Sequence, residues 1–171
     1  MSYLVDTTYF AKGQLAINNV TDTGFAGLSV AENVSDYVAR YEPVYLTKLL
    51  GATLYAYLVA HQTEPRIVAL IAKLRNSTDK ISPIASYIYY RYMQENQVIQ
   101  TEGGDKETAP AGMTTMANLA KHCAIWNWMS DQSTIINDWL TDNLATYPEF
   151  SQTSDEDLES WELFEHINTI L

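Results

Sequence analysis

The sequence predicts one mainly α-helical domain, a multi-helix bundle with a projecting β-hairpin or loop and an extended N-terminal arm. From Ser29 onward, apolar residues recur at the spacing of three and four that marks one face of a helix. The 171 residues are 47% hydrophobic, which is enough to enclose one core. No linker or internal repeat divides the chain, so we expect a single domain over residues 1–171.

The N-terminal part divides into an arm and a helix. Residues 1–28 contain Gly13, Gly24 and Gly27 and lack a sustained helical period, so we expect an extended arm. Because Pro43 disfavours helical geometry at the residue before it, the next helix should end near Tyr41. The residues expected on its buried face are Val30, Val34, Tyr37, Val38 and Tyr41.

Further helices complete the first half of the domain, residues 29–96. Pro43 can occupy the first turn of a helix in which leucines recur every four residues. Gly51 either caps that helix or lies within a longer one. The next helix should begin near Pro65 and end at a polar turn over 76–79.

A helix start is best marked at Ser82 and Pro83. The serine side chain can cap the helix. Proline is favourable at the first helical position, because the N–H that it lacks would have no partner within the helix there. The helix should run to Asn96 and carries aromatic residues around most of its circumference. A helix that is apolar on several sides is usually central in its domain or lies against another subunit.

Residues 97–112 should form the projecting hairpin or loop. Val98, Ile99 and Thr101 favour a strand, and Gly103–Gly104 favours a turn.

Residues 113–171 should form a long helix and an acidic C-terminal helix. The apolar period of the long helix reaches about Leu144, which gives a length of roughly 45 Å unless Ser130–Ser133 divides it. Tyr147–Pro148 should close this helix. The last helix should begin at Ser154, where three acidic residues follow a capping hydroxyl.

The net charge of −11 restricts the possible partners. Residues 1–100 carry 8 acidic and 8 basic side chains, whereas residues 101–171 carry 13 and 2. A surface of this sign repels phosphate, so binding along a nucleic-acid groove is not expected. No run of about 18 uninterrupted apolar residues is present, so we expect no membrane span.

The reactive side chains give no catalytic constellation. Cys123 lies beside His122, but adjacent helical residues point in different directions, so Cys123 is expected in the core. The histidines match no metal-ligand spacing, and Glu162 and His166 lack the Glu-x-x-His pattern of a di-iron bundle. We therefore expect no catalytic residue, cofactor or metal.

Aromatic residues are the best candidates for an interface. The chain has 12 Tyr and 4 Trp, more than a core of this size requires, and both types are favoured at protein interfaces. The candidate interface residues are Tyr87, Tyr89, Tyr90, Tyr92, Trp126 and Trp128.

Three segments carry a resemblance to a known family. They are YVARYEPVYLTKLLGATLYAYL at residues 37–58, SPIASYIYYRYMQEN at 82–96 and AIWNWM at 124–129. In order and pattern, over about two thirds of the chain, they resemble the head-tail connector or head-completion (adaptor) proteins of tailed phages, especially prophage proteins of Bacteroides-like bacteria.

The resemblance implies a virion-assembly role without catalysis. Such subunits form a homo-oligomeric ring between the portal protein and a tail-side adaptor, and DNA passes through as non-specific cargo. The implied location is the cytoplasm of the bacterial host during assembly and then the head-tail junction of the virion. The loop that would reach the portal or line the channel comprises Thr101, Glu102, Gly103, Gly104, Asp105 and Lys106.

Two alternatives come from other functional classes. One is a small acidic helical regulator whose C-terminal region masks a basic partner. The other is an enzyme with a metal site built from scattered carboxylates and His166.

Overall fold

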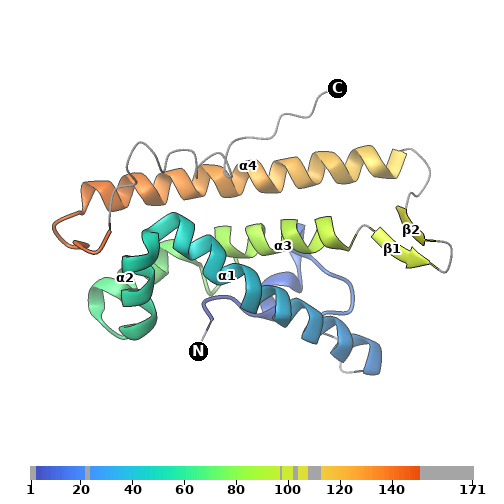
Figure 1. The fold of residues 1–171 in the computed structure, drawn as a ribbon, viewed down its shortest axis with the longest axis horizontal. Coiled ribbons are helices and arrows are strands. Elements are labelled where there is room, and N and C mark those ends of the chain that lie inside the picture. Colours follow the sequence, from blue (N-terminus) through green and yellow to red (C-terminus); the bar gives the residue numbers. More distant parts are fainter. Residues whose placement is uncertain (1–2, 22–23, 97, 102–103, 108–112, 151–171) are drawn as a thin grey trace.

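The computed structural model describes residues 3–21, 24–96, 98–101, 104–107 and 113–150. Helices dominate these residues, which confirms the predicted all-α class. Figure 1 shows the elements in chain order. They are η1 (Thr7–Phe10), η2 (Gly13–Leu15), α1 (Phe25–Ala60), α2 (Pro65–Leu74), α3 (Pro83–Glu95), β1 (Val98–Thr101), β2 (Gly104–Glu107) and α4 (Met113–Asp142).

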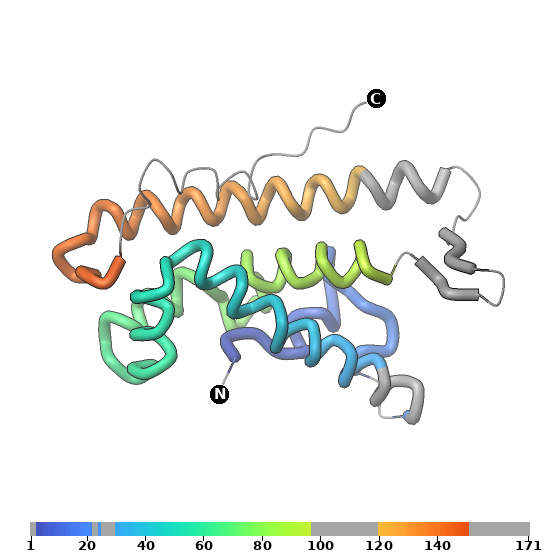
Figure 2. The backbone as a smooth tube through the Cα atoms, viewed as in Figure 1, coloured from blue at the N-terminus to red at the C-terminus, as the bar shows by residue number. Residues whose placement is uncertain are grey.

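Helix α3 lies at the centre of the fold. It packs against both α1 and α4, which contact each other much less (Figures 1 and 2). Every residue from Pro83 to Tyr89 is buried, so α3 has no solvent face over its first two turns. Of the two positions predicted for this helix, central in the domain or against another subunit, the structure shows the central one.

The start of α3 is fixed by Ser82, as predicted. The Ser82 hydroxyl accepts a hydrogen bond from the amide of Ile84 at 3.2 Å and donates one to the carbonyl oxygen of Leu74 at 2.9 Å. One buried side chain therefore caps α3 and connects it to the end of α2. The polar turn between them is also present, since Asn76 pairs with Ile81 as an isolated β-bridge.

The prediction that a helix ends near Tyr41 is wrong. Helix α1 continues through Pro43, and its non-helical residue is Gly51, with φ 75° and ψ 157°. Proline removes one backbone hydrogen bond, but Tyr45, Leu46 and other residues beyond it are buried on the same helix. Packing of these side chains offsets the local cost, and the break occurs at the residue without a Cβ.

The prediction of an extended N-terminal arm over residues 1–28 is also wrong. Leu4, Val5, Tyr9, Phe10 and Val20 are buried in the same core as the helices. The segment folds through the short 3-10 helices η1 and η2, and α1 already begins within the range assigned to the arm. Turns of three or four residues leave no periodic signal, which is why the sequence pattern did not show them.

A buried carboxylate fixes the beginning of the described chain. Glu42 of α1 is only 4% exposed and accepts hydrogen bonds from the amides of Leu4 at 2.7 Å and Val5 at 3.0 Å. Arg75 donates to the carbonyl oxygen of Leu4. These contacts hold residues 4–5 against α1 and the end of α2.

Helix α4 is not divided at Ser130–Ser133. The hydroxyl of Ser133 donates to the carbonyl oxygen of Met129 at 2.7 Å and lies 2.7 Å from the hydroxyl of Tyr45. Because the polar atom of Ser133 is satisfied within its own helix, it can be fully buried without ending α4. The acidic helix predicted from Ser154 lies outside the described residues.

Strands β1 and β2 pair antiparallel, with Val98 opposite Glu107 and Thr101 opposite Gly104. They pair only with each other within the described chain, so they add no sheet layer to the helical fold.

Among the described residues, one helix is long and apolar enough to cross a membrane by length and composition alone. It is the part of α1 from Val30 to Ala60, with a mean hydropathy of 1.2. A core helix of a folded domain passes the same test of length and composition, and Leu49, Leu50 and Leu54 of this helix are buried inside the domain.

Glu42 should make stability depend on pH. Burial raises the pKa of Glu42 to about 7, although the amides of Leu4 and Val5 and the charge of Arg75 oppose the shift. Between the ordinary carboxyl value and about 7, the folded state binds more protons at this group than the unfolded state. Stability from Glu42 is therefore lost as the pH rises through this window.

The substitution Glu42→Gln should remove this contribution, which amounts to roughly 3 kcal/mol across the window. Urea unfolding of wild type and variant at pH 5 and pH 8 measures the difference. Glu32→Gln, at an exposed position on the same helix, is the matched control. The prediction would be contradicted if the free energy of unfolding changed between pH 5 and pH 8 by the same amount in Glu42→Gln as in wild type.

Gly51 should resist substitution by alanine. A residue with a Cβ is strained at φ 75° and ψ 157°, so Gly51→Ala should lower the free energy of unfolding by about 1–3 kcal/mol. Chemical denaturation measures this effect. Ala52→Ser, at the next and exposed position, should cost less than about 0.5 kcal/mol. Equal effects of the two substitutions would refute the assignment of the break to Gly51.

Candidate functional site

An aromatic layer joins α1, α3 and α4. Ring centroids lie 5.5 Å apart for Tyr45 and Tyr87, 4.6 Å for Tyr90 and Trp126, and 5.1 Å for Tyr37 and Tyr92. These separations are typical of favourable aromatic pairs. Much of the aromatic content therefore serves packing within one chain.

The structure divides the six candidate interface residues into two groups. Tyr87, Tyr89 and Trp126 are at most 5% exposed and belong to the core, so they are not available to another subunit. This corrects their assignment to an interface: three helices meet around α3, and their facing aromatic residues fill the space between them. Tyr90 and Tyr92 are half-buried, and Trp128 is 37% exposed.

The hydroxyl groups of the tyrosines are also used inside the chain. Tyr37 donates to Glu95 at 2.8 Å, and Tyr41 donates to the other oxygen of the same carboxylate. Burial, followed by the hydrogen bond to Glu95, raises the pKa of Tyr37 to about 12. Lys121 donates to the hydroxyl of Tyr89 at 2.9 Å. These contacts fix the tyrosines in place.

A stripe of exposed side chains, two of them large and apolar, remains on the outward face of α4. Trp128 is 37% exposed and Ile135 is 59% exposed. The two are seven residues apart, so they share one helical face about 10 Å apart. Ala124 and Asp131, which lie between or beside them at helical spacing, are exposed as well. This stripe, Ala124–Trp128–Asp131–Ile135, is called the α4 face below.

A cavity of about 460 Å³ lies beside Trp128. The N-terminal segment forms one wall through Tyr9 and residues 12–15, and the turn over 79–82 forms another. Ile125, Trp128 and Ser86 complete the lining from α4 and α3. This cavity is called the N-terminal groove.

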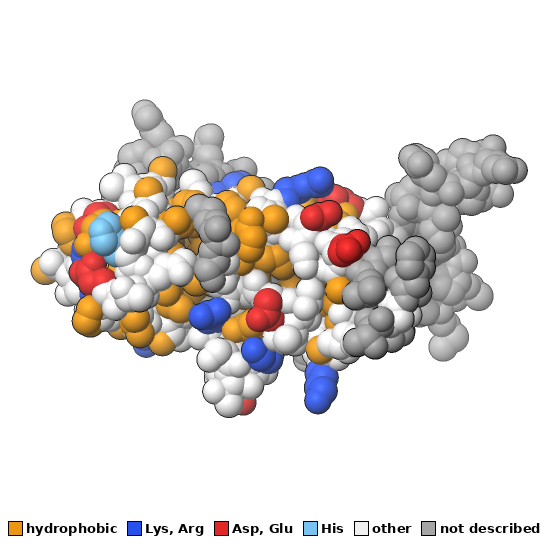
Figure 3. Space-filling view, turned by 90° about the horizontal axis from the view of Figure 1, so that it is seen from below, with side chains coloured by type: hydrophobic (Ala, Val, Ile, Leu, Met, Phe, Trp, Pro, Cys, Tyr) orange, Lys and Arg blue, Asp and Glu red, His pale blue; other side chains and the backbone are white. Residues whose placement is uncertain are grey.

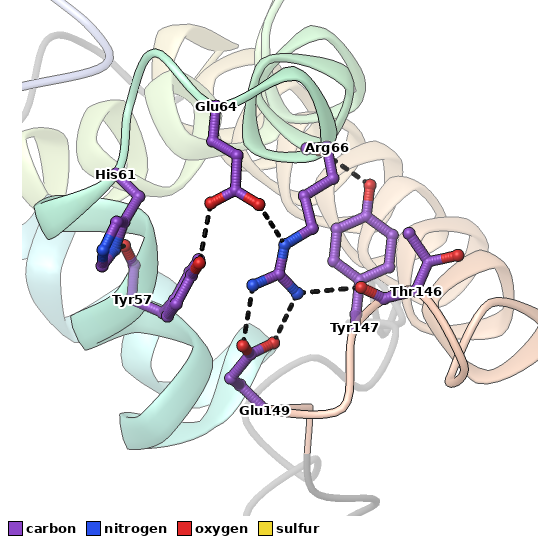
Figure 4. Close-up of polar contacts among 7 residues, drawn as sticks. All are labelled: Tyr57, His61, Glu64, Arg66, Thr146, Tyr147 and Glu149. Carbon is purple, nitrogen blue, oxygen red and sulfur yellow. Dashed lines mark hydrogen bonds and ion pairs between the residues drawn. The ribbon is translucent and has the colours of Figure 1, made fainter.

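Arg66 holds the end of the described chain against α2 (Figure 4). Its guanidinium donates two hydrogen bonds of 2.8 Å to the carboxylate of Glu149 and one of 2.8 Å to Glu64. It also donates to the carbonyl oxygen of Thr146, while the Tyr147 hydroxyl donates to the carbonyl oxygen of Arg66. Hydrogen bonds from Arg66 lower the pKa of Glu149. The cluster is a structural clasp.

The reactive side chains do not converge on a catalytic arrangement in the described part of the chain. Cys123 and His122 are both buried, 5% and 6% exposed, and the His122 ring packs edge-on against Tyr89 at 6.4 Å. Burial and then the charge of Lys121 lower the pKa of His122. Among the described residues, no group of three His, Cys, Asp or Glu side chains could hold a metal ion.

Other predicted site residues fall partly outside the described chain. Thr101, Gly104, Asp105 and Lys106 lie in β1 and β2, whereas Glu102 and Gly103 are outside the described residues. Residues 154–171, with Glu162 and His166, are also outside them, so the acidic partner-masking function and the metal enzyme stay predictions.

Charged side chains are dispersed on one broad face. Viewed from below, apolar side chains gather over the middle, and the Lys and Arg side chains lie apart from one another (Figure 3). The described residues of this face therefore form no continuous basic patch of the kind that follows a phosphate backbone.

The Arg66 clasp should matter more than an ordinary surface ion pair. Arg66→Ala should lower the urea midpoint clearly more than Arg40→Ala, because Arg40 is 66% exposed and lies 3.7 Å from Glu95. Arg66→Lys should restore little, since lysine cannot pair with both oxygens of Glu149. Full recovery in Arg66→Lys would show that charge alone, without the bidentate geometry, holds the chain end.

Comparison with known proteins returned no match to a family model, to a curated protein or to a solved structure.

Proposed function

We propose that this chain is a structural subunit that forms a ring at the head-tail junction of a tailed phage, between the portal protein and a tail-side adaptor. The observation that carries the proposal is the α4 face, where Trp128 and Ile135 are exposed on one side of a long helix. Exposed large apolar side chains on a rigid helix suit contact with another protein. The subunit acts through such contacts and catalyses no reaction.

The interior supports a mechanical role for the subunit. Tyrosine side chains pack against other rings and form hydrogen bonds between α1, α3 and α4, for example Tyr45 with Tyr87 and with Ser133. Satisfied buried polar groups and close aromatic pairs favour a single well-defined shape. A subunit that must present the same surface to each neighbour in a ring requires such a shape.

The charge supports the proposed handling of DNA. A net charge of −11 repels phosphate. DNA would then pass a ring of such subunits as non-specific cargo without being held. The loop over Thr101–Lys106 is proposed to contact the portal or line the channel.

Self-association should depend on the α4 face. Ile135→Asp places a charge at an exposed apolar position, so it should weaken association by about tenfold or more if this face is buried between subunits. Native mass spectrometry over a range of concentrations measures the distribution of oligomers. Val68→Asp is the matched control, because Val68 is 49% exposed on α2. If Ile135→Asp and Val68→Asp weakened association equally, the effect would not be specific to the α4 face and the prediction would be contradicted.

Co-purification with the portal protein of the proposed phage tests the assignment itself. The proposal expects a stable complex whose electron micrographs show a ring beneath the portal. A chain that stays monomeric at high concentration and does not bind the portal would refute it.

A further inference from the structure

The N-terminal groove combines an apolar floor with a cationic rim. Leu15, Ile81, Ile125 and Trp128 supply apolar surface. Lys12 and Lys80 also line the groove, and the ammonium group of Lys80 lies 5.0 Å from the centre of the Tyr9 ring. The one acidic side chain in the lining, Asp79, accepts a hydrogen bond from Asn76 at 2.7 Å. The groove therefore suits a ligand that is apolar on one side and acidic on the other.

The chain itself contains a segment with this chemistry. Residues 154–171 carry six acidic side chains and no Lys or Arg, in a sequence whose spacing predicts a helix. Its apolar positions recur every three residues, at Leu158, Trp161, Phe164 and Ile167. Acidic and apolar residues thus alternate along a length of about 27 Å if the segment is helical.

The proposed ring assigns this segment to the groove of a neighbouring copy. Phe150, at the end of the described chain, is buried, and Glu149 is held by Arg66 beside the start of α2. The groove lies near Trp128, about 20 Å back along α4 from Asp142. The attachment point of the segment and the N-terminal groove therefore lie on different parts of the subunit. A contact between different surfaces of identical subunits is head-to-tail, and it closes into a ring when the rotation permits.

We propose that the N-terminal groove of each subunit binds the acidic, aromatic segment 154–171 of the next copy of this chain. Lys12 and Lys80 contact the carboxylates of the segment, and the floor around Ile125 and Trp128 takes its aromatic side chains. The inference rests on the proposed function, because it specifies the contact by which the ring forms.

Two full-length variants separate the two sides of this contact. The groove variant carries Lys12→Glu and Lys80→Glu, and the segment variant carries Trp161→Ser and Phe164→Ser. Each variant alone should associate at least about tenfold more weakly than wild type. High salt should weaken the association of wild type in the same way as the groove substitutions do, because it screens the attraction between lysines and carboxylates. The control variant, Arg40→Glu with Lys73→Glu, has the same net charge as the groove variant and should associate like wild type.

Mixing the two variants distinguishes a neighbour from the same chain. The groove variant still offers an intact segment and the segment variant an intact groove, so the mixture should give a one-to-one complex in native mass spectrometry. A labelled peptide of residues 154–171 should bind the segment variant and not the groove variant, as measured by fluorescence anisotropy. Circular dichroism of each variant checks that the helical fold is retained.

The possible failures are distinguishable. If wild type forms oligomers and both variants do so equally well, this inference is wrong and the proposed function stands. A mixture without a heterocomplex would also overturn the inference, because an intact segment and an intact groove on different copies would then not bind each other. A wild-type chain that never associates would overturn the proposed function together with it.

Discussion

The burial of α3 between α1 and α4 is the constraint on which the rest of this structure depends. A helix that is covered on all sides must find apolar or satisfied polar partners around its whole circumference. The aromatic layer provides these partners, with Tyr87 of α3 against Tyr45 of α1 and Trp126 of α4. Once α3 is covered in this way, the remaining elements take positions around it. The N-terminal segment and α2 then close the end of the core.

Local signals in the sequence predicted the parts of the fold that depend on local chemistry. Ser82 and Pro83 begin α3 because a hydroxyl cap and a missing N–H act within a few residues. Pro43 misled the prediction because its local cost is outweighed by the burial of residues such as Leu46 in the folded domain. The N-terminal segment was missed for a related reason. Glu42 fixes it from nearly 40 residues away, and sequence periodicity contains no information about such a contact.

The candidate interface was predictable only in part. Composition showed an excess of aromatic residues but not which of them face inward, because α3 is apolar on several sides. The structure places Tyr87, Tyr89 and Trp126 in the core and leaves Trp128 at the surface. Neither the exposure of Ile135 nor the meeting of Lys12 with Lys80 around one groove follows from spacing in the sequence. The first depends on how α4 is rotated over α3, and the second on how the N-terminal segment folds back.

Helix α3 forms the interior of the subunit, and α4 carries the surface that is proposed to meet other subunits. Hydrogen exchange of the wild-type chain, measured by mass spectrometry at low and high protein concentration, tests both parts together. The amides of α3 should exchange most slowly at both concentrations, and those of α4 should gain protection as concentration rises. Rapid exchange in α3, or protection of α4 that does not change with concentration, would contradict these assignments.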